Sequence, residues 1–447
     1  MDLKRAHRAA RRRREETGAP PHAVAHVKRG IAQQFEKGRT AGSGALAAFL
    51  AVLGPGLLAG LSDDDPAGIT TYSMLGADHG YRLLWIIPAS TILLIQFHLM
   101  AVRIGAATGK GFVGIIRHTW GRNAGYAAVI GLLFANFGTI CAEYAGIAAA
   151  GSLVGVPNWI SAPLSGVLLS LIVVLGSFHR VERVLLVISS TLALYIVDGL
   201  LARPEWSTVL NNSLIPRMPL NSAGWIALAA ALGTTLAPWG LAFIQSYAVD
   251  KKITVANLRL ERVDVLIGSV LTGVIGLAIA VACAATLNKQ GVHIKDAGDA
   301  ALALRPLAGS FATVLFGAGL LGASLLAAAI VPIATAYSIA EGVGEPASLD
   351  LDAHHFQWFY AAFIGLTVAA VSVVSLPGLP LIPLIYTSQV VNAVLLPLHV
   401  IALQLLAGNA AIMGESRSGV WSRASGWVSI ALISACIGAL AWSWITG

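Results

Sequence analysis

The residues with the clearest chemistry are three consecutive aspartates, Asp63, Asp64 and Asp65, followed at once by Pro66. They interrupt a long apolar stretch, residues 45–77. An ionisable side chain at the centre of a bilayer costs ~2.5–3.5 kcal/mol on insertion scales, so it needs a functional reason. Proline interrupts a helix and frees backbone carbonyl groups. The pattern predicts a broken transmembrane helix with a cation-binding site at the break.

A second apolar stretch, residues 223–247, is interrupted in a similar way. Pro238 lies near its centre, preceded by Thr234 and Thr235 and followed by Gly240. Since the two breaks fall in the first and sixth predicted spans, the second broken helix should cross the membrane in the opposite direction to the first. Two unwound helices of opposite orientation are typical of transporters built from inverted repeats, which bind substrate near the bilayer midplane.

The composition indicates a multi-span membrane protein and excludes an ordinary soluble domain. Of 447 residues, 56% are hydrophobic and only 11% are charged. Apolar segments of bilayer length predict eleven spans, at residues 45–77, 83–103, 124–151, 160–178, 183–202, 223–247, 263–286, 308–340, 357–376, 381–407 and 426–446. We expect a first five-helix repeat (45–202), a second five-helix repeat (223–407), and a connection with an eleventh helix (408–447).

Residues 1–44 precede the first span and are strongly basic. Residues 1–40 hold 11 basic and 4 acidic side chains, a difference that accounts for the whole formal net charge of +7. We expect a disordered cytoplasmic tail near anionic lipid and no binding of nucleic acid. The predicted inner loops hold twelve Lys and Arg residues and the outer loops six. The positive-inside rule therefore predicts a plasma (inner) membrane protein with a cytoplasmic N-terminus and an external C-terminus.

Several motifs, taken in order, resemble the Nramp family of divalent-metal transporters. They are Leu53-Gly54-Pro55, Asp65-Pro66-Ala67-Gly68, Gly80-Tyr81-Arg82-Leu83-Leu84-Trp85, Arg103-Ile104-Gly105-Ala106-Ala107-Thr108-Gly109-Lys110, Ser388-Gln389-Val390-Val391 and Leu396-Pro397. The resemblance covers residues 45–415 and is closest in motif character to the Nramp-related magnesium transporters. It implies an all-α polytopic protein of the LeuT type, a five-plus-five inverted repeat plus an eleventh helix. Spans one and six would be unwound at the midplane, and transport would proceed by alternating access.

The resemblance also implies a metal site at the two breaks. The family's Asp-Pro-Gly-Asn motif falls on residues 65–68, so its aspartate is kept as Asp65 and its asparagine ligand is replaced by Gly68. Its methionine ligand on span six is replaced by Ala237. The family's carbonyl ligands, one on each broken helix, match Ser62 and Thr234, and its glutamine on span ten matches Gln389. The complete set of metal positions is Ser62, Asp65, Gly68, Thr234, Ala237 and Gln389.

The missing methionine changes the selectivity that we expect. A thioether is a soft ligand that favours transition metals, and Ala237 removes it and enlarges the cavity. The remaining ligands are oxygens, which Mg²⁺ requires, and a roomier site suits an ion that keeps several of its waters. We therefore expect import of Mg²⁺ and Mn²⁺, with the transported ion as substrate and no cofactor.

Proton coupling is the second departure from the family. Proton-coupled members use an acid on span three, a histidine on span six and basic residues on span nine. Glu143 matches the acid, but Trp239 replaces the histidine and residues 358–376 contain no Lys or Arg. We therefore expect transport without proton coupling, with a proton-coupled Mn²⁺/Fe²⁺ symporter as the alternative. Glu143 is interpreted either as a proton acceptor or as a buried acid paired to a backbone donor.

Other polar residues have further candidate roles. Asp63 and Asp64 either line a vestibule, where they would raise the local cation concentration, or help to coordinate the ion. The hydroxyl group of Thr235 is a further candidate ligand. Asn392 is interpreted as an interhelical hydrogen-bonding residue and a minor candidate for the ion path. Asp198, near the outer end of span five, is interpreted as a charge at the membrane interface.

Two different classes of function are disfavoured. An organic-substrate symporter of the same fold would present helix N-termini to a carboxylate, which three aspartates would repel. An enzyme would need a catalytic pair on facing spans or a motif such as His-Glu-x-x-His, and the sequence shows neither. We expect a transporter that is not an enzyme and whose functional unit is a monomer.

Overall fold

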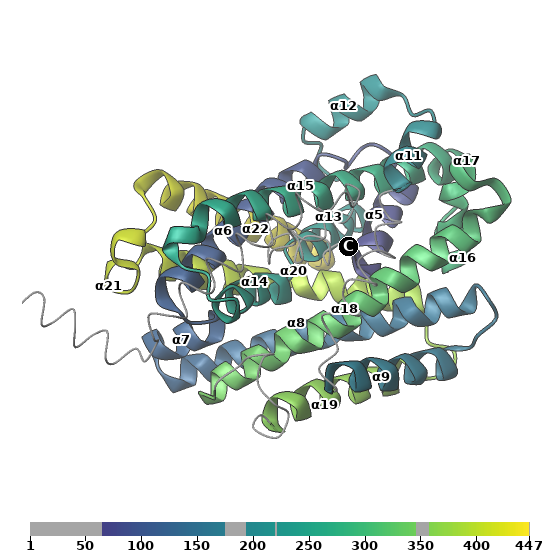
Figure 1. Ribbon diagram of the computed structural model, residues 1–447. Coiled ribbons are helices and arrows are strands. Elements are labelled where there is room, and N and C mark those ends of the chain that lie inside the picture. Colours follow the sequence, from purple (N-terminus) through teal and green to yellow (C-terminus); the bar gives the residue numbers. More distant parts are fainter. Residues whose placement is uncertain (1–64, 175–193, 220, 346–356, 447) are drawn as a thin grey trace, which may run out of the picture. The chain divides into compact units, whose positions relative to one another are not determined.

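The computed structural model describes residues 65–174, 194–219, 221–345 and 357–446, all of which belong to the unit Pro55–Gly447 (Figure 1). The expected basic tail, residues 1–44, and the upstream half of the first span lie outside these residues. Within the described ranges every regular element is a helix. The expected all-α class is therefore confirmed.

Each predicted span coincides with at least part of a helix. The helices are α5 (Pro66–His79), α6 (Ile86–Thr108), α8 (Arg122–Ser152), α9 (Asn158–Val174), α11 (Leu194–Leu201), α13 (Ser222–Thr235), α14 (Pro238–Asp250), α15 (Leu258–Cys283), α18 (Ala312–Val343), α19 (Gln357–Val374), α20 (Leu381–Gly408) and α22 (Val420–Thr446). A π-helix, Ala284–Asn288, continues α15. Seven described helical segments are long and apolar enough to cross a membrane.

Shorter helices form the connections. They are α7 (Phe112–Trp120), α12 (Trp206–Leu214), α16 (Ala297–Ala301), α17 (Arg305–Ala308) and α21 (Ala410–Met413). Helix α7 buries Phe112, Val113, Ile115 and Ile116, so one of its faces packs on the protein. These elements carry no span-length apolar run, which is why hydropathy did not reveal them.

The second predicted break is confirmed. Helix α13 ends at Thr235, two residues leave the helical conformation, and α14 begins at Pro238. Helix α5 likewise begins at Pro66, directly after the last of the three aspartates. Proline suits the first position of a helix because the missing N–H would have no helical partner there. A helix therefore begins at a proline at both predicted breaks.

Small residues let the helices around the breaks approach closely. Helix α8 packs against α18 and α20, and α5 packs against α13, α15 and α20 (Figure 1). A Cβ atom at Gly233 would overlap the backbone carbonyl oxygen of Gln389 on α20. A Cβ atom at Gly146 would overlap Pro66 and Ser324, so α8 touches both the first turn of α5 and the middle of α18. Close backbone contact at small residues is typical of membrane helix interfaces.

Gly76→Ala should destabilise the protein because α5 and α15 meet at this glycine. The added methyl carbon would lie 2.9 Å from the backbone carbonyl carbon of Ala280 and closer still to its oxygen. We expect a loss of about 1–3 kcal/mol, the usual cost of overpacking, measured as a lower melting temperature in detergent. Gly131→Ala on α8 is the matched control, since its added methyl would meet nothing within 4 Å. Equal melting of Gly76→Ala and wild type would contradict this packing.

Candidate functional site

Asp65 occupies the break at the start of α5. Its side chain is 4% exposed, and Oδ1 accepts a hydrogen bond of 2.7 Å from the backbone N–H of Gly68. The carboxylate therefore caps α5, where the free N–H groups and the helix dipole favour a negative charge. A carboxylate has about four lone-pair directions, so capping leaves capacity for a cation. Gly68 acts here through its backbone N–H, which points to Asp65.

Glu143 of α8 lies close enough to Asp65 for the two carboxyl groups to interact electrostatically. It is fully buried, and neither of its oxygens has a hydrogen-bond partner in the described part of the chain. No backbone donor among the described residues pairs with Glu143, as one of its two interpretations requires. Two neighbouring buried carboxyl groups favour a shared positive charge, either a proton or a metal ion.

Gln389 belongs to a hydrogen-bonded group that joins α20 to α8. The side-chain amide of Asn392 donates to Oε1 of Gln389 at 3.0 Å and to Oγ1 of Thr139 at 2.9 Å. The Gln389 amide in turn donates to Oγ of Ser388 at 2.7 Å. Oδ1 of Asn392 is buried and has no partner among the described residues. Asn392 thus orients Gln389 and has an unused oxygen of its own.

The two threonines at the end of α13 differ in their bonding. The hydroxyl group of Thr235 donates to the Ala231 carbonyl at 2.7 Å and bonds the hydroxyl groups of Tyr72 at 2.8 Å and Ser90 at 3.1 Å. One donor and two acceptors are the full capacity of a hydroxyl group, so these contacts can occupy it completely. The hydroxyl group of Thr234 is buried without a partner in the described ranges. Of the two side chains, that of Thr234 retains a free oxygen.

Ala237 and Trp239 line the second break. Ala237 is 4% exposed and precedes α14 without a side-chain cap. Trp239 is 1% exposed, and its indole N–H has no partner among the described residues. An indole N–H only donates, so Trp239 cannot accept and release a proton as imidazole does. Phe243 and Tyr247 continue a row of aromatic rings along α14, with ring centroids 6.3 Å and 5.0 Å apart in succession.

The expected site residues thus lie on helices that pack together. Asp65 is on α5, Thr234 on α13 and Gln389 on α20, and α5 packs against both of the others. Ser62, Asp63 and Asp64 fall outside the described residues. The described ranges contain no group of three or more His, Cys, Asp and Glu side chains that could hold a metal ion. An ion bound here would take much of its coordination from neutral oxygens and water.

Contacts at the C-terminal end of α14 were not expected from the sequence. Glu341 of α18 accepts hydrogen bonds from Oγ of Ser246 at 2.7 Å and from the backbone N–H of Gly114 at 3.0 Å. The Tyr337 hydroxyl group donates to Asp250 at 2.8 Å. These bonds join α18, α14 and the start of α7. Glu341 lies just past the eighth predicted span, and no motif marks its partners, which are distant in sequence.

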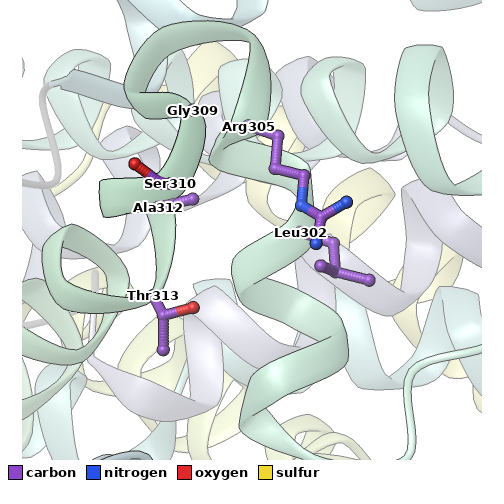
Figure 2. A pocket seen from close by; sticks show the side chains of 6 residues that line it. All are labelled: Leu302, Arg305, Gly309, Ser310, Ala312 and Thr313. Atoms are coloured by element: carbon purple, nitrogen blue, oxygen red, sulfur yellow. The ribbon is translucent and has the colours of Figure 1, made fainter.

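A surface cavity lies elsewhere, on the connection into α18. Its volume is about 290 Å³, and none of the predicted metal residues lines it. Figure 2 shows the Arg305 guanidinium group and the hydroxyl groups of Ser310 and Thr313 at this cavity. The full lining is Leu302, Arg305, Gly309, Ser310, Ala312 and Thr313.

Curated relatives match the chain over most of its length. A divalent metal cation transporter MntH from Aeromonas hydrophila is 28% identical over 395 residues, which are 86% of this chain and 93% of the relative. The MntH protein of Deinococcus radiodurans is 27% identical over 422 residues, covering 91% and 93% of the two chains.

Solved structures show the same fold. A manganese transporter of Eremococcus coleocola aligns with a TM-score of 0.71 and 21% identity, over 89% of this chain and 87% of that one. Mhp1, a nucleobase-cation-symport-1 family transporter, aligns with a TM-score of 0.51 and 14% identity, over 88% and 93%. The LeuT-type fold is therefore confirmed. The model of the Nramp family, described as natural resistance-associated macrophage protein-like, matches residues 56–443, and the chain belongs to this family.

Proposed function

We propose that this protein imports divalent metal cations across the membrane by alternating access, with Mg²⁺ and Mn²⁺ as the favoured ions and without proton coupling. The observation that carries the proposal is the buried Asp65 carboxylate, which caps a helix restarted at a proline and lies next to Glu143. Two acidic groups enclosed by protein at such a break suit a divalent cation. The relatives named divalent metal cation transporters support this substrate class.

The preference for Mg²⁺ and Mn²⁺ follows from the donor atoms that surround the breaks. The buried groups there that lack a partner among the described residues include the oxygens of Glu143, Thr234 and Asn392. Ala237 occupies the position of the family's soft ligand. Hard cations prefer oxygen ligands, and Mg²⁺ tolerates a site in which water completes its coordination.

The absence of proton coupling is proposed because a relay away from Asp65 is incomplete. Trp239 cannot accept a proton, and the sequence of α19 contains no Lys or Arg. The proximity of Glu143 to Asp65 favours the second candidate, a proton-coupled Mn²⁺/Fe²⁺ symporter, since a proton on this pair would leave when a metal ion binds. The two functions differ in whether metal entry acidifies the lumen.

Alternating access requires that the contacts around the break rearrange. The bonds from Glu341 to Ser246 and Gly114 hold α14 against α18 and α7. If the N-terminus is cytoplasmic and the C-terminus external, as the positive-inside rule predicts, these contacts lie on the cytoplasmic side. They would then separate when the ion leaves the site. The functional unit in this proposal is a monomer, because both breaks belong to one chain.

Asp65→Ala should abolish metal uptake while the protein still inserts and folds. Losing a buried charged ligand typically costs about 2–5 kcal/mol, or roughly 30-fold or more in affinity. The measurement is Mn²⁺ influx into proteoliposomes, with size-exclusion elution as the test of folding. Glu415→Ala, which removes an exposed carboxylate, is the control and should transport normally. Retained Mn²⁺ uptake in Asp65→Ala would remove the site assignment.

Ala237→Met should shift preference from Mg²⁺ towards Mn²⁺ and Cd²⁺ by about tenfold, or ~1.4 kcal/mol, because it restores a soft ligand. The measurement is competition between these ions for uptake into proteoliposomes. Ala237→Leu is the matched control, since leucine adds nearly the same volume without sulfur. If the methionine and leucine variants show the same competition profile, the missing thioether does not set selectivity.

Mn²⁺ influx through the wild-type protein should leave luminal pH unchanged. The experiment records influx and a luminal pH dye in the same liposomes, with the membrane potential clamped. Acidification that follows metal entry and disappears in Glu143→Gln would instead establish the proton-coupled symporter. A proton ionophore added at the end shows that the dye responds.

A further inference from the structure

A second buried carboxyl group lies outside the metal site. Asp198 of α11 is 0% exposed, so protein encloses its side chain. Its place at the membrane interface stays a prediction. Helix α11 packs against α15, where a Cβ atom at Gly199 would lie 3.3 Å from the backbone oxygen of Ala278, and against α17. Packing on these neighbours turns Asp198 inward.

Few of the described groups around Asp198 could stabilise a negative charge on its carboxylate. Oδ1 accepts one hydrogen bond, of 3.1 Å, from the backbone N–H of Leu307 at α17. Oδ2 is buried and has no partner in the described ranges, where no basic side chain forms an ion pair with Asp198. An ionised carboxylate enclosed in this way costs several kcal/mol.

Other polar groups with unused capacity surround Asp198. The hydroxyl group of Tyr195 is buried without a hydrogen-bond partner in the described part of the chain, and it interacts electrostatically with Asp198 and Cys283. The Cys283 thiol lies beside Ser73 of α5, whose hydroxyl group also lacks a conventional partner among the described residues. Among the described residues, Tyr195 and Cys283 are titratable groups that interact electrostatically with Asp198, and Arg305 of α17 is exposed and forms no ion pair with it. The cluster thus joins α5, α11 and α15.

The chemistry of this cluster suits a proton better than a metal ion. Among the described residues of this cluster, three side chains offer oxygen and one offers a thiol, but Asp198 has the only carboxyl group, whereas Mg²⁺ requires octahedral coordination by oxygen. A proton needs one acceptor, and a protonated carboxyl group becomes a donor for a neighbouring oxygen. Protonation would therefore remove the buried charge and use the free acceptors.

We propose that Asp198 is a proton-binding site, distinct from the metal site, which holds a proton whenever α5, α11 and α15 pack as in this structure. Loss of the proton would leave a buried charge and weaken this packing. Ser73 lies on the same helix that Asp65 caps, eight residues further on. The protonation state of Asp198 therefore biases the position of the helix that carries the metal ligand. Only this last consequence rests on the proposed transport function.

Infrared spectroscopy of the purified full-length protein tests the site directly. We expect the wild type to show, in mildly acidic buffer, the carbonyl stretch of a protonated carboxylic acid that is missing from Asp198→Asn. Glu205→Gln, which changes an exposed carboxylate, is the control and should leave this band unchanged. Identical wild-type and Asp198→Asn spectra in this region would overturn the proposal. If Asp198→Asn does not fold, Tyr195→Phe should shift the band, and an unshifted band would overturn it equally.

The pH dependence of stability provides a second measurement. Since the folded protein would bind this proton more tightly than the unfolded chain, the contribution is present at low pH and is lost as pH rises. The melting temperature of the wild type should therefore fall more between mildly acidic and mildly alkaline buffer than that of Asp198→Asn, by roughly 2 °C or more. Parallel curves would contradict the proposal. Both measurements test proton binding at Asp198 even if the protein did not take up Mn²⁺.

Discussion

The structure depends on how backbone groups are satisfied where a helix restarts inside an apolar protein. Water cannot reach such a helix start freely, and at α5 a side chain takes up an exposed N–H group. Asp65 does this for α5 by accepting from Gly68, and Pro66 reduces the demand because it has no N–H. The same carboxyl group that stabilises the helix end is thereby held buried in the protein, and in the proposed function it is also the cation ligand. Capping of α5 and the proposed ion binding would then be two consequences of one constraint.

The neighbouring helices extend this constraint across the protein. Gly146 lets α8 touch Pro66, which brings Glu143 to Asp65, and Gly233 lets α13 meet the backbone of α20 at Gln389. Asn392 then bonds α20 to α8. Small residues, rather than the polar ones, therefore decide which functional groups meet, because only they allow backbones to approach so closely.

The residues that depart from the family pattern lie at a helix break whose backbone keeps the expected form. Ala237 and Trp239 lie at a break with the expected proline, in a chain whose relatives include transporters of divalent metals. The changes remove a sulfur ligand and a proton carrier but keep the acid and the helix restart. Under the proposed function they alter which ion and which coupling the site favours, while the fold of the family is kept.

Much of this architecture was predictable from the sequence, because apolar length, proline position and the place of an acid within a span are local properties. The positions of the long described helices, the break before Pro238 and the place of Asp65 at the start of α5 follow from them. Hydropathy could not distinguish Thr234 from Thr235, nor show that Asp198 is enclosed. Nor could it pair Glu341 with Ser246, 95 residues away. Only the tertiary structure decided these three features, because burial and hydrogen-bond partners depend on which helices pack together.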